Sequence, residues 1–337
     1  MKQSIMFFIC VFLGVLLAGC SQKDNPTGPR SSNLIPNDEL PWASAICATP
    51  NAIIATGLIG GSGVYIFRST DNGSNWVVVD TIEVNTHPPN TFLFVIPSTT
   101  LFVHGTDVFA GISALSGGVY VSTDGGRNWE ESDSNFTENV NCFAAINGRI
   151  FAATDSGVFS STNVGLSWSA TGKLPSRIVV RLATDGNTLF AGAGGIFISN
   201  DDGATWNEAD SGVTNRDIVA LAASGSEIIA GTFQYPNYPP ESTGGIFISE
   251  DMGAHWILSN SGLTNDDIGA LYSYNSELFA GTDQGLFLST DSGQTWTDVS
   301  AGTQADSTSI SWIAPLGSSV FVVAGSGPQA SIIRVPL

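Results

Sequence analysis

The sequence predicts an all-β protein built from copies of one small sheet, and three observations support this prediction. Short β-branched and aromatic runs such as GGIFIS alternate with Gly-rich turns, which is the pattern of strands. No amphipathic helical stretch of useful length occurs. The phrase Ser-x-Asp-x-Gly-x-x-Trp recurs at residues 69–76, 122–129, 161–168, 199–206, 249–256 and 289–296. A unit of about 40 residues repeated in this way is typical of a propeller blade.

One blade can be followed through residues 216–260, where RDIVALAASG, SEIIAGT, GGIFISED and HWILSNSG predict four antiparallel strands, innermost strand first. Second and third strands can be counted seven times along the chain. We therefore predict one domain over residues 41–337, a seven-bladed β-propeller of four-stranded antiparallel blades. The seventh copy stops without the phrase or a fourth strand. We expect an amino-terminal strand near residues 33–36 to close it, because an incomplete blade leaves an open sheet edge.

The repeated phrase has a mechanical explanation at the turn between third and fourth strands. Its Asp accepts backbone N–H bonds, its Gly takes a positive φ, and its Trp begins the outer strand and packs over the turn. The third copy has Asn, which keeps an acceptor. We assign a structural role to the acidic or amide positions Asp71, Asp124, Asn163, Asp201, Asp251 and Asp291. The matching indoles are Trp76, Trp129, Trp168, Trp206, Trp256 and Trp296.

The first 19 residues are predicted to be a targeting segment, with Lys2 before an apolar run at 5–18. The run ends in Leu-Ala-Gly-Cys, which resembles the lipobox of bacterial lipoproteins. This resemblance implies cleavage before Cys20 and acylation of its thiol, with residues 20–40 as a flexible tether. Ser21 after the anchor fits sorting to the outer membrane. We therefore expect a protein of the cell envelope, periplasmic or surface-exposed, attached to the membrane through Cys20.

Composition excludes several classes of function. The formal net charge of −19 repels phosphate backbones, so we expect no nucleic-acid partner. Beyond the anchor, Cys47 and Cys142 fall in equivalent strands of non-adjacent repeats, which predicts two buried free thiols. The His and Cys residues lie in unrelated contexts, so we expect no metal site and no cofactor.

The phrase resembles the Asp box of bacterial neuraminidase repeats. Such repeats occur in sialidases, xyloglucan-type glycosidases, sortilin-like receptors and seven-bladed photosystem II assembly factors. The resemblance covers about residues 43–337 and implies the propeller fold, but these families do not share one chemistry. Sialidases have an Arg-Ile-Pro segment, an arginine triad and a Tyr/Glu pair. This chain has no Arg-Ile-Pro, and Arg68 and Arg127 lie beside or inside Asp boxes, away from the ligand side.

Two long loops are expected on the face opposite the Asp boxes, at residues 81–98 and 233–243. Long loops on a rigid scaffold commonly carry binding. Tyr235 and Tyr238, held between prolines, are candidates for a platform that stacks on a sugar or peptide. The alternative is that these loops only cap the ends of blades.

Charged residues near the first strands are the other candidates. Aligned on their second strands, the repeats place Arg181 near the central channel, in a column otherwise occupied by Ala45, Cys142, Ala220, Ala270 and Trp312. Such an Arg needs a partner, either an acid of the protein such as Asp217 or a carboxylate of a ligand bound with Arg177 and Arg216. Asp217 and Asp267 begin neighbouring first strands in one register. They are interpreted either as an acid and base pair for glycoside hydrolysis or as turn residues, since Asn139 occupies the same place.

These observations favour a lipid-anchored, non-catalytic module that binds or assembles a protein or glycan on the loop face. The alternative is a glycoside hydrolase of sialidase or β-glucan type, with Asp217, Asp267 and the arginines as its site. A third possibility is a structural surface spacer. No complete catalytic set of a known family is found in the sequence.

Overall fold

The computed structural model describes residues 34–36, 43–58, 63–83, 98–114, 117–224, 227–233, 244–325 and 330–337. Residues Asn33–Leu337 form one compact unit, distinct from Met1–Ser32. The predicted signal peptide, Cys20 and most of the predicted tether lie outside the described residues. No helix long and apolar enough to cross a membrane occurs in the described part of the chain.

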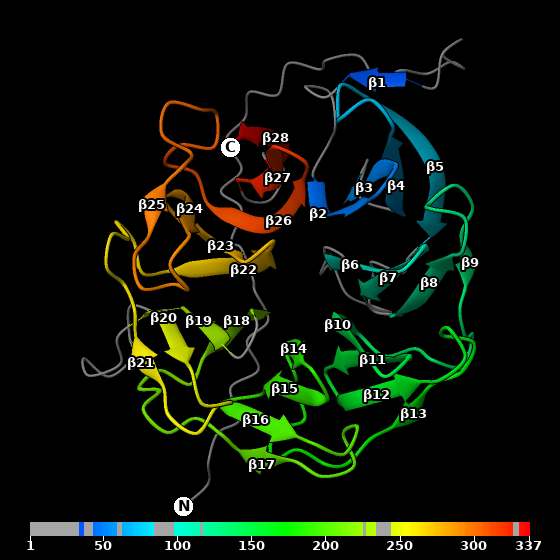
Figure 1. The fold of residues 1–337 in the computed structure, drawn as a ribbon. Helices are drawn as coiled ribbons and strands as arrows, with labels where there is room; N and C mark the ends of the chain where they lie inside the picture. Colours follow the sequence, from blue (N-terminus) through cyan, green and yellow to red (C-terminus); the bar gives the residue numbers. More distant parts are fainter. Residues whose placement is uncertain are drawn as a thin grey trace, which may run out of the picture. The chain divides into compact units, whose positions relative to one another are not determined.

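Within this unit the fold is all-β, and seven antiparallel sheets succeed one another around a ring (Figure 1). Blade 1 contains β2 (Ala43–Thr49), β3 (Ala52–Leu58), β4 (Gly63–Ser69) and β5 (Asn75–Glu83). Blade 2 contains β6 (Ser98–His104), β7 (Asp107–Ser113), β8 (Gly118–Ser122) and β9 (Glu130–Glu131). Blade 3 contains β10 (Val140–Ile146), β11 (Arg149–Thr154), β12 (Gly157–Ser161) and β13 (Ser169–Ala170).

The next three sheets repeat this pattern. Blade 4 contains β14 (Arg181–Asp185), β15 (Thr188–Gly192), β16 (Ile196–Ser199) and β17 (Asn207–Glu208). Blade 5 contains β18 (Ile218–Ser224), β19 (Glu227–Thr232), β20 (Gly245–Ser249) and β21 (Ile257–Leu258). Blade 6 contains β22 (Ile268–Tyr274), β23 (Glu277–Thr282), β24 (Gly285–Ser289) and β25 (Thr297–Asp298). The predicted seven-bladed β-propeller is thus confirmed.

The closure of the ring differs from our prediction. Blade 7 contains β26 (Ile310–Leu316), β27 (Ser319–Ala324) and β28 (Ser331–Pro336), with no fourth strand among the described residues. The amino-terminal strand β1 (Leu34–Pro36) instead pairs with β5 at the outer edge of blade 1, with Ile35 opposite Trp76. The prediction that this strand completes the last blade is therefore wrong. β5 is long, and its outer edge offers unpaired backbone groups that β1 satisfies.

Side-chain packing holds the two ends of the ring together. Phe67 and Trp76 of blade 1 share one buried cluster with Phe321 and Ile332 of blade 7. The backbone N–H of Ala43 also donates to the carbonyl of Ala330 over 3.2 Å. Each fully buried aromatic ring of this kind stabilises the fold by about 2 to 3 kcal/mol. The first and last blades therefore meet through a hydrophobic seam.

The same packing occurs at the other junctions between blades. The second strands are almost wholly apolar and buried, and Phe109, Phe190 and Phe321 lie on them. In three copies, the Gly of an Asp box lies against one of these rings from the preceding blade, as Gly73 does against Phe321. A Cβ on Gly73 would stand 2.9 Å from that ring, and its φ is +79°. The box Gly is needed here for close approach as well as for backbone conformation.

Candidate functional site

The six Asp boxes are closed hydrogen-bond systems. In the first, Ser69 Oγ donates to Asp71 Oδ1 over 2.8 Å, and the Gly73 N–H donates to Ser69 Oγ over 2.9 Å. The Asn75 N–H donates to Asp71 Oδ1 over 2.9 Å, and its side-chain amide donates to Oδ2 over 2.8 Å. The later carboxylate boxes repeat the side-chain bond with Asn128, Thr205, His255 and Thr295 in place of Asn75. In the third box its direction is reversed, because the Asn163 side-chain amide donates to Ser167 Oγ over 3.0 Å.

These bonds account for the charge state of the box carboxylates. Hydrogen bonds from Thr295 lower the pKa of Asp291 to about 2, and those from His255 do the same for Asp251. The pKa values of Asp71, Asp124 and Asp201 are lowered in the same way, by bonds from the residue four positions later. Carboxylates held charged by their own turn are poor proton donors, and their oxygens are already occupied.

Three of the six box indoles join neighbouring blades, whereas Trp76 and Trp129 donate to carbonyls of their own turns. Nε1 of Trp256 donates to the Ala209 carbonyl over 2.7 Å, and Nε1 of Trp296 donates to the Ser259 carbonyl over 3.1 Å. Both acceptors belong to the preceding blade. Trp206 differs, because its buried Nε1 has no hydrogen-bond partner within the described ranges. The hydrogen-bonding groups of the boxes thus stabilise turns and blade junctions, and few of them are left to bind a ligand.

The two strand-start aspartates hold equivalent turn positions. The N–H groups of Asp217 and Asp267 donate to the side-chain oxygens of Asn215 and Asn265 over 3.0 and 2.9 Å. The Asp267 carbonyl accepts the Asp283 N–H, just as the Asn139 carbonyl accepts that of Asp155. Neither aspartate lines the central pocket described below. Asp217 Oδ2 is buried and has no hydrogen-bond partner in the described part of the chain.

The three candidate arginines lie in three different environments. Arg216 forms ion pairs with Glu208 and with Asp210, the latter over 2.6 Å, and these interactions raise its pKa. Arg177 is exposed. Arg181 is half-buried in the central channel and forms no ion pair with a described residue. The three guanidinium groups therefore do not converge in one pocket.

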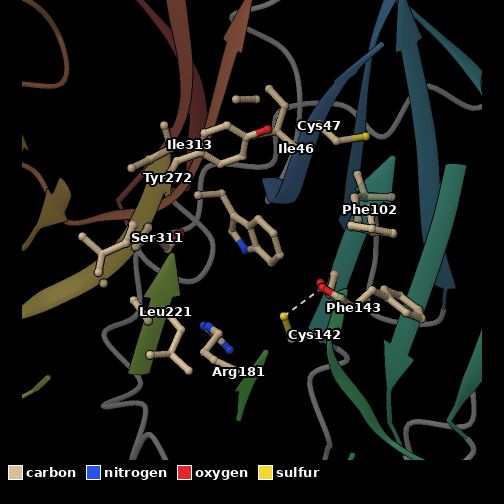
Figure 2. A pocket seen from close by; sticks show the side chains of 18 of the residues that line it. Ile46, Cys47, Phe102, Cys142, Phe143, Arg181, Leu221, Tyr272, Ser311 and Ile313 are labelled. Atoms are coloured by element: carbon tan, nitrogen blue, oxygen red, sulfur yellow. Dashed lines mark hydrogen bonds between the residues drawn. The ribbon is translucent and has the colours of Figure 1, made fainter. Parts of the chain in front are cut away.

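The central channel contains a cavity of about 250 Å³. Residues from all seven innermost strands line it, among them Cys142 of β10, Arg181 of β14 and Trp312 of β26. Figure 2 shows the guanidinium group of Arg181, the thiols of Cys47 and Cys142 and the ring of Tyr272 around this cavity. The strand register explains this convergence, because Arg181 lies opposite Gly192 as Ala220 lies opposite Gly231 on the next blade.

Both cysteines are free thiols. Cys47 is buried, whereas Cys142 is half-buried and its Sγ donates to the Phe143 carbonyl over 3.4 Å (Figure 2). Burial raises the pKa of both thiols, and the nearby charge of Arg181 only partly offsets this for Cys142. Both groups are therefore neutral at physiological pH. No group of three or more potential metal-binding side chains occurs among the described residues.

The aromatic residues predicted for binding differ from those that line the channel. Tyr235 and Tyr238 lie outside the described residues, as do the central parts of both long loops. Tyr272 and Phe102 line the channel but were not predicted as site residues. The sequence could have indicated them, because each lies two residues after the position equivalent to Arg181 in its own blade, Ala270 and Thr100 respectively.

Comparison with known proteins supports the fold. The family model described as the DUF6242 beta propeller domain matches residues 101–220. The solved structure of YCF48 bound to D1 peptide has a TM-score of 0.62 at 15% identity, covering 90% of this chain and 96% of that chain. This chain is a seven-bladed β-propeller. A comparison with curated protein sequences gives no match.

Two further structures show how widely this fold is used. A GH74 xyloglucanase from Xanthomonas campestris has a TM-score of 0.57 at 13% identity, covering 84% of this chain and 51% of that chain. This chain thus spans about half of the enzyme. A chain of the mitotic checkpoint complex has a TM-score of 0.61 at 14% identity, covering 96% of this chain and 99% of that chain. At such identities the likeness concerns the fold alone.

Proposed function

We propose that this chain is a lipid-anchored, extracytoplasmic propeller that acts as a non-catalytic binding or assembly module for a partner protein. The observation that carries the proposal is the dispersal of its candidate catalytic groups. Arg216 is neutralised by Glu208 and Asp210, while Asp217 and Asp267 are held in turns by neighbouring asparagines. Catalysis by two carboxylates needs both at one cleft with a defined separation.

The choice of a protein over a glycan as partner rests on the similar propellers. One of them was solved with a D1 peptide bound, and another is part of a multiprotein complex. A propeller presents a rigid face on which loops and channel together can recognise an extended segment. By analogy, we place the partner on the face opposite the Asp boxes, where the long loops are expected.

The anchor and location can be tested in cells. We expect the full chain, expressed in a Gram-negative host, to incorporate labelled palmitate and to fractionate with the outer membrane. Cys20→Ser should lose both label and membrane attachment, while the control Cys47→Ser keeps them. Label on Cys20→Ser, or a soluble wild-type protein, would contradict the proposed anchor.

Partner binding can be tested with the detergent-solubilised full chain on arrays of peptides and glycans. We expect peptides to be retained, and retention to fall when substitutions are made on the loop face. A matched substitution on the Asp-box face, such as Arg127→Met, should leave retention unchanged. Retention of glycans alone would reject the protein partner, and no retention of either would reject the binding module.

One observation keeps the hydrolase alternative open. The buried Asp217 Oδ2 lacks a hydrogen-bond partner among the described residues, and such a carboxylate is a candidate general acid. The assay is hydrolysis of sialosides and β-glucans by the full chain. Activity that Asp217→Asn abolishes and the neighbouring Asp266→Asn leaves intact would establish the enzyme and overturn the non-catalytic proposal.

A further inference from the structure

The channel cavity is positively charged in a protein that is otherwise strongly acidic. The chain carries 30 acidic and 11 basic residues, yet among the described residues Arg181 is the one charged side chain that lines this cavity. The rest of the lining is mainly apolar or aromatic, including Leu221, Tyr272 and Trp312. The cavity thus combines a single cation with an apolar wall.

Arg181 has almost no partner within the protein. Its one side-chain hydrogen bond to a described residue runs from Nη1 to the carbonyl of Val180, over 2.9 Å. The other N–H donors of the guanidinium group therefore have no acceptor among the residues that the structure describes. Burial lowers the pKa of Arg181, but an arginine remains protonated at physiological pH. Arg216, by contrast, has two carboxylate partners at the surface.

The neighbouring groups do not supply a counter-ion. Cys142 is a thiol that donates to the Phe143 carbonyl, and burial raises its pKa. Burial raises the pKa of Cys47 and of Tyr272 as well, so both keep their protons. A guanidinium group that is half-buried, cationic and unneutralised is a favourable site for an anion, since bidentate binding of a carboxylate matches its geometry.

We propose that the channel cavity binds one carboxylate carried on a small apolar or aromatic group, with Arg181 as the residue that contacts the carboxylate. The volume of about 250 Å³ lies below the range of about 300–1,000 Å³ usual for drug-sized ligands, so the ligand is small. Leu221, Tyr272 and Trp312 form the wall against its apolar part. The carboxylate belongs either to a free acid or to the last residue of a protein chain.

This inference goes beyond the proposed partner protein, because a free acid would satisfy it. The test is calorimetric titration of the full chain with 3-phenylpropionate and with its neutral amide. We expect the acid to bind about 10- to 100-fold more tightly than the amide, the usual effect of a charge-assisted bond. Arg181→Met should remove this preference, Arg181→Lys should keep part of it, and the surface control Arg216→Met should keep all of it.

A second pair of probes separates the two sources of the carboxylate. A short peptide ending in Phe is titrated as the free acid and as the C-terminal amide. Preference for the peptide acid indicates a protein terminus, whereas binding of phenylpropionate without binding of the peptide indicates a free acid. Equal affinity for acid and amide, an unchanged preference in Arg181→Met, or no binding of any acid by the folded wild type overturns the proposal. None of these results depends on the peptide and glycan arrays, so the two proposals can fail separately.

Discussion

The Asp boxes, which we call the rim, differ from the central channel in how many hydrogen-bond partners their charged side chains have. On the rim, Asp291 accepts from Ser289, from the Thr295 N–H and from the Thr295 hydroxyl. In the channel, Arg181 makes one side-chain hydrogen bond to a described residue and faces no acid in the cavity lining. A charged side chain whose hydrogen-bond partners belong to the fold has a structural role. A charged side chain that faces a cavity without such partners indicates a binding site for a ligand.

The difference also concerns packing. Some rim glycines, such as Gly73 and Gly262, lie against a buried ring or the backbone of a neighbouring blade, leaving no space for a methyl group. The channel instead holds a cavity of about 250 Å³ between seven strands. Substitutions on the rim should therefore affect stability, and substitutions in the channel should affect binding.

The largest effect is expected for Gly262→Ala, at the junction between blades 5 and 6. Gly262 has φ +92°, and a Cβ there would stand 2.1 Å from the Trp296 carbonyl oxygen in the next box. We expect a loss of about 3 kcal/mol or more in the free energy of unfolding, since overpacking adds to backbone strain. Urea denaturation measures it.

Gly302→Ala is the matched control for this prediction. Gly302 occupies the corresponding loop after blade 6, with φ +77°, and no atom of a described residue lies within 4 Å of where its Cβ would stand. It should lose only about 1 kcal/mol, from backbone strain alone. If Gly262→Ala and Gly302→Ala lowered the unfolding free energy equally, the close packing of the Gly262 loop against the next Asp box would not contribute to stability.

A moderate effect is expected for Ser289→Ala in the sixth box. Ser289 is buried, and its Oγ both donates to Asp291 and accepts the Gly293 N–H over 2.8 Å. Removal leaves that buried N–H unsatisfied, so we expect a loss of about 1 to 3 kcal/mol in unfolding free energy. The exposed Ser261→Ala should change stability by less than about 0.5 kcal/mol. If Ser289→Ala lowered the unfolding free energy no more than the control does, the hydrogen bonds of the box would not contribute to stability.

A smaller effect concerns acid. The pKa of Asp291 lies at about 2 in the folded chain, below its ordinary value of 3.8, because Thr295 donates to the charged form. Its contribution to stability is complete above about pH 4 and is lost as pH falls through about 2. Asp291→Asn, which copies the natural Asn163, should melt slightly below wild type at neutral pH. The gap in melting temperature should narrow between about pH 4 and 2, and parallel curves would contradict this.

The structural features that repeat from blade to blade could be predicted from the sequence. Six boxes fixed the turn between third and fourth strands, and aligned second strands placed Arg181 in the channel column, where the structure has it. Features that occur only once in the chain could not be predicted in this way. Pairing of β1 with β5 depends on the length of an exposed strand edge. The ion pairs of Arg216 with Glu208 and Asp210 depend on how one loop returns after β17. Neither leaves a periodic signal.

The smallest effect on stability is expected for Arg181→Met, although Arg181 is the more buried of the two arginines compared. A cation without a protein counter-ion contributes little to folding, and its replacement by an apolar side chain of similar length removes a desolvated charge. The free energy of unfolding should therefore stay within about 0.5 kcal/mol of wild type or rise. Arg216→Met, which loses two exposed ion pairs, should cost less than about 1 kcal/mol. A loss above about 2 kcal/mol for Arg181→Met would mean that the protein itself satisfies this arginine, and the contrast between rim and channel would then fail.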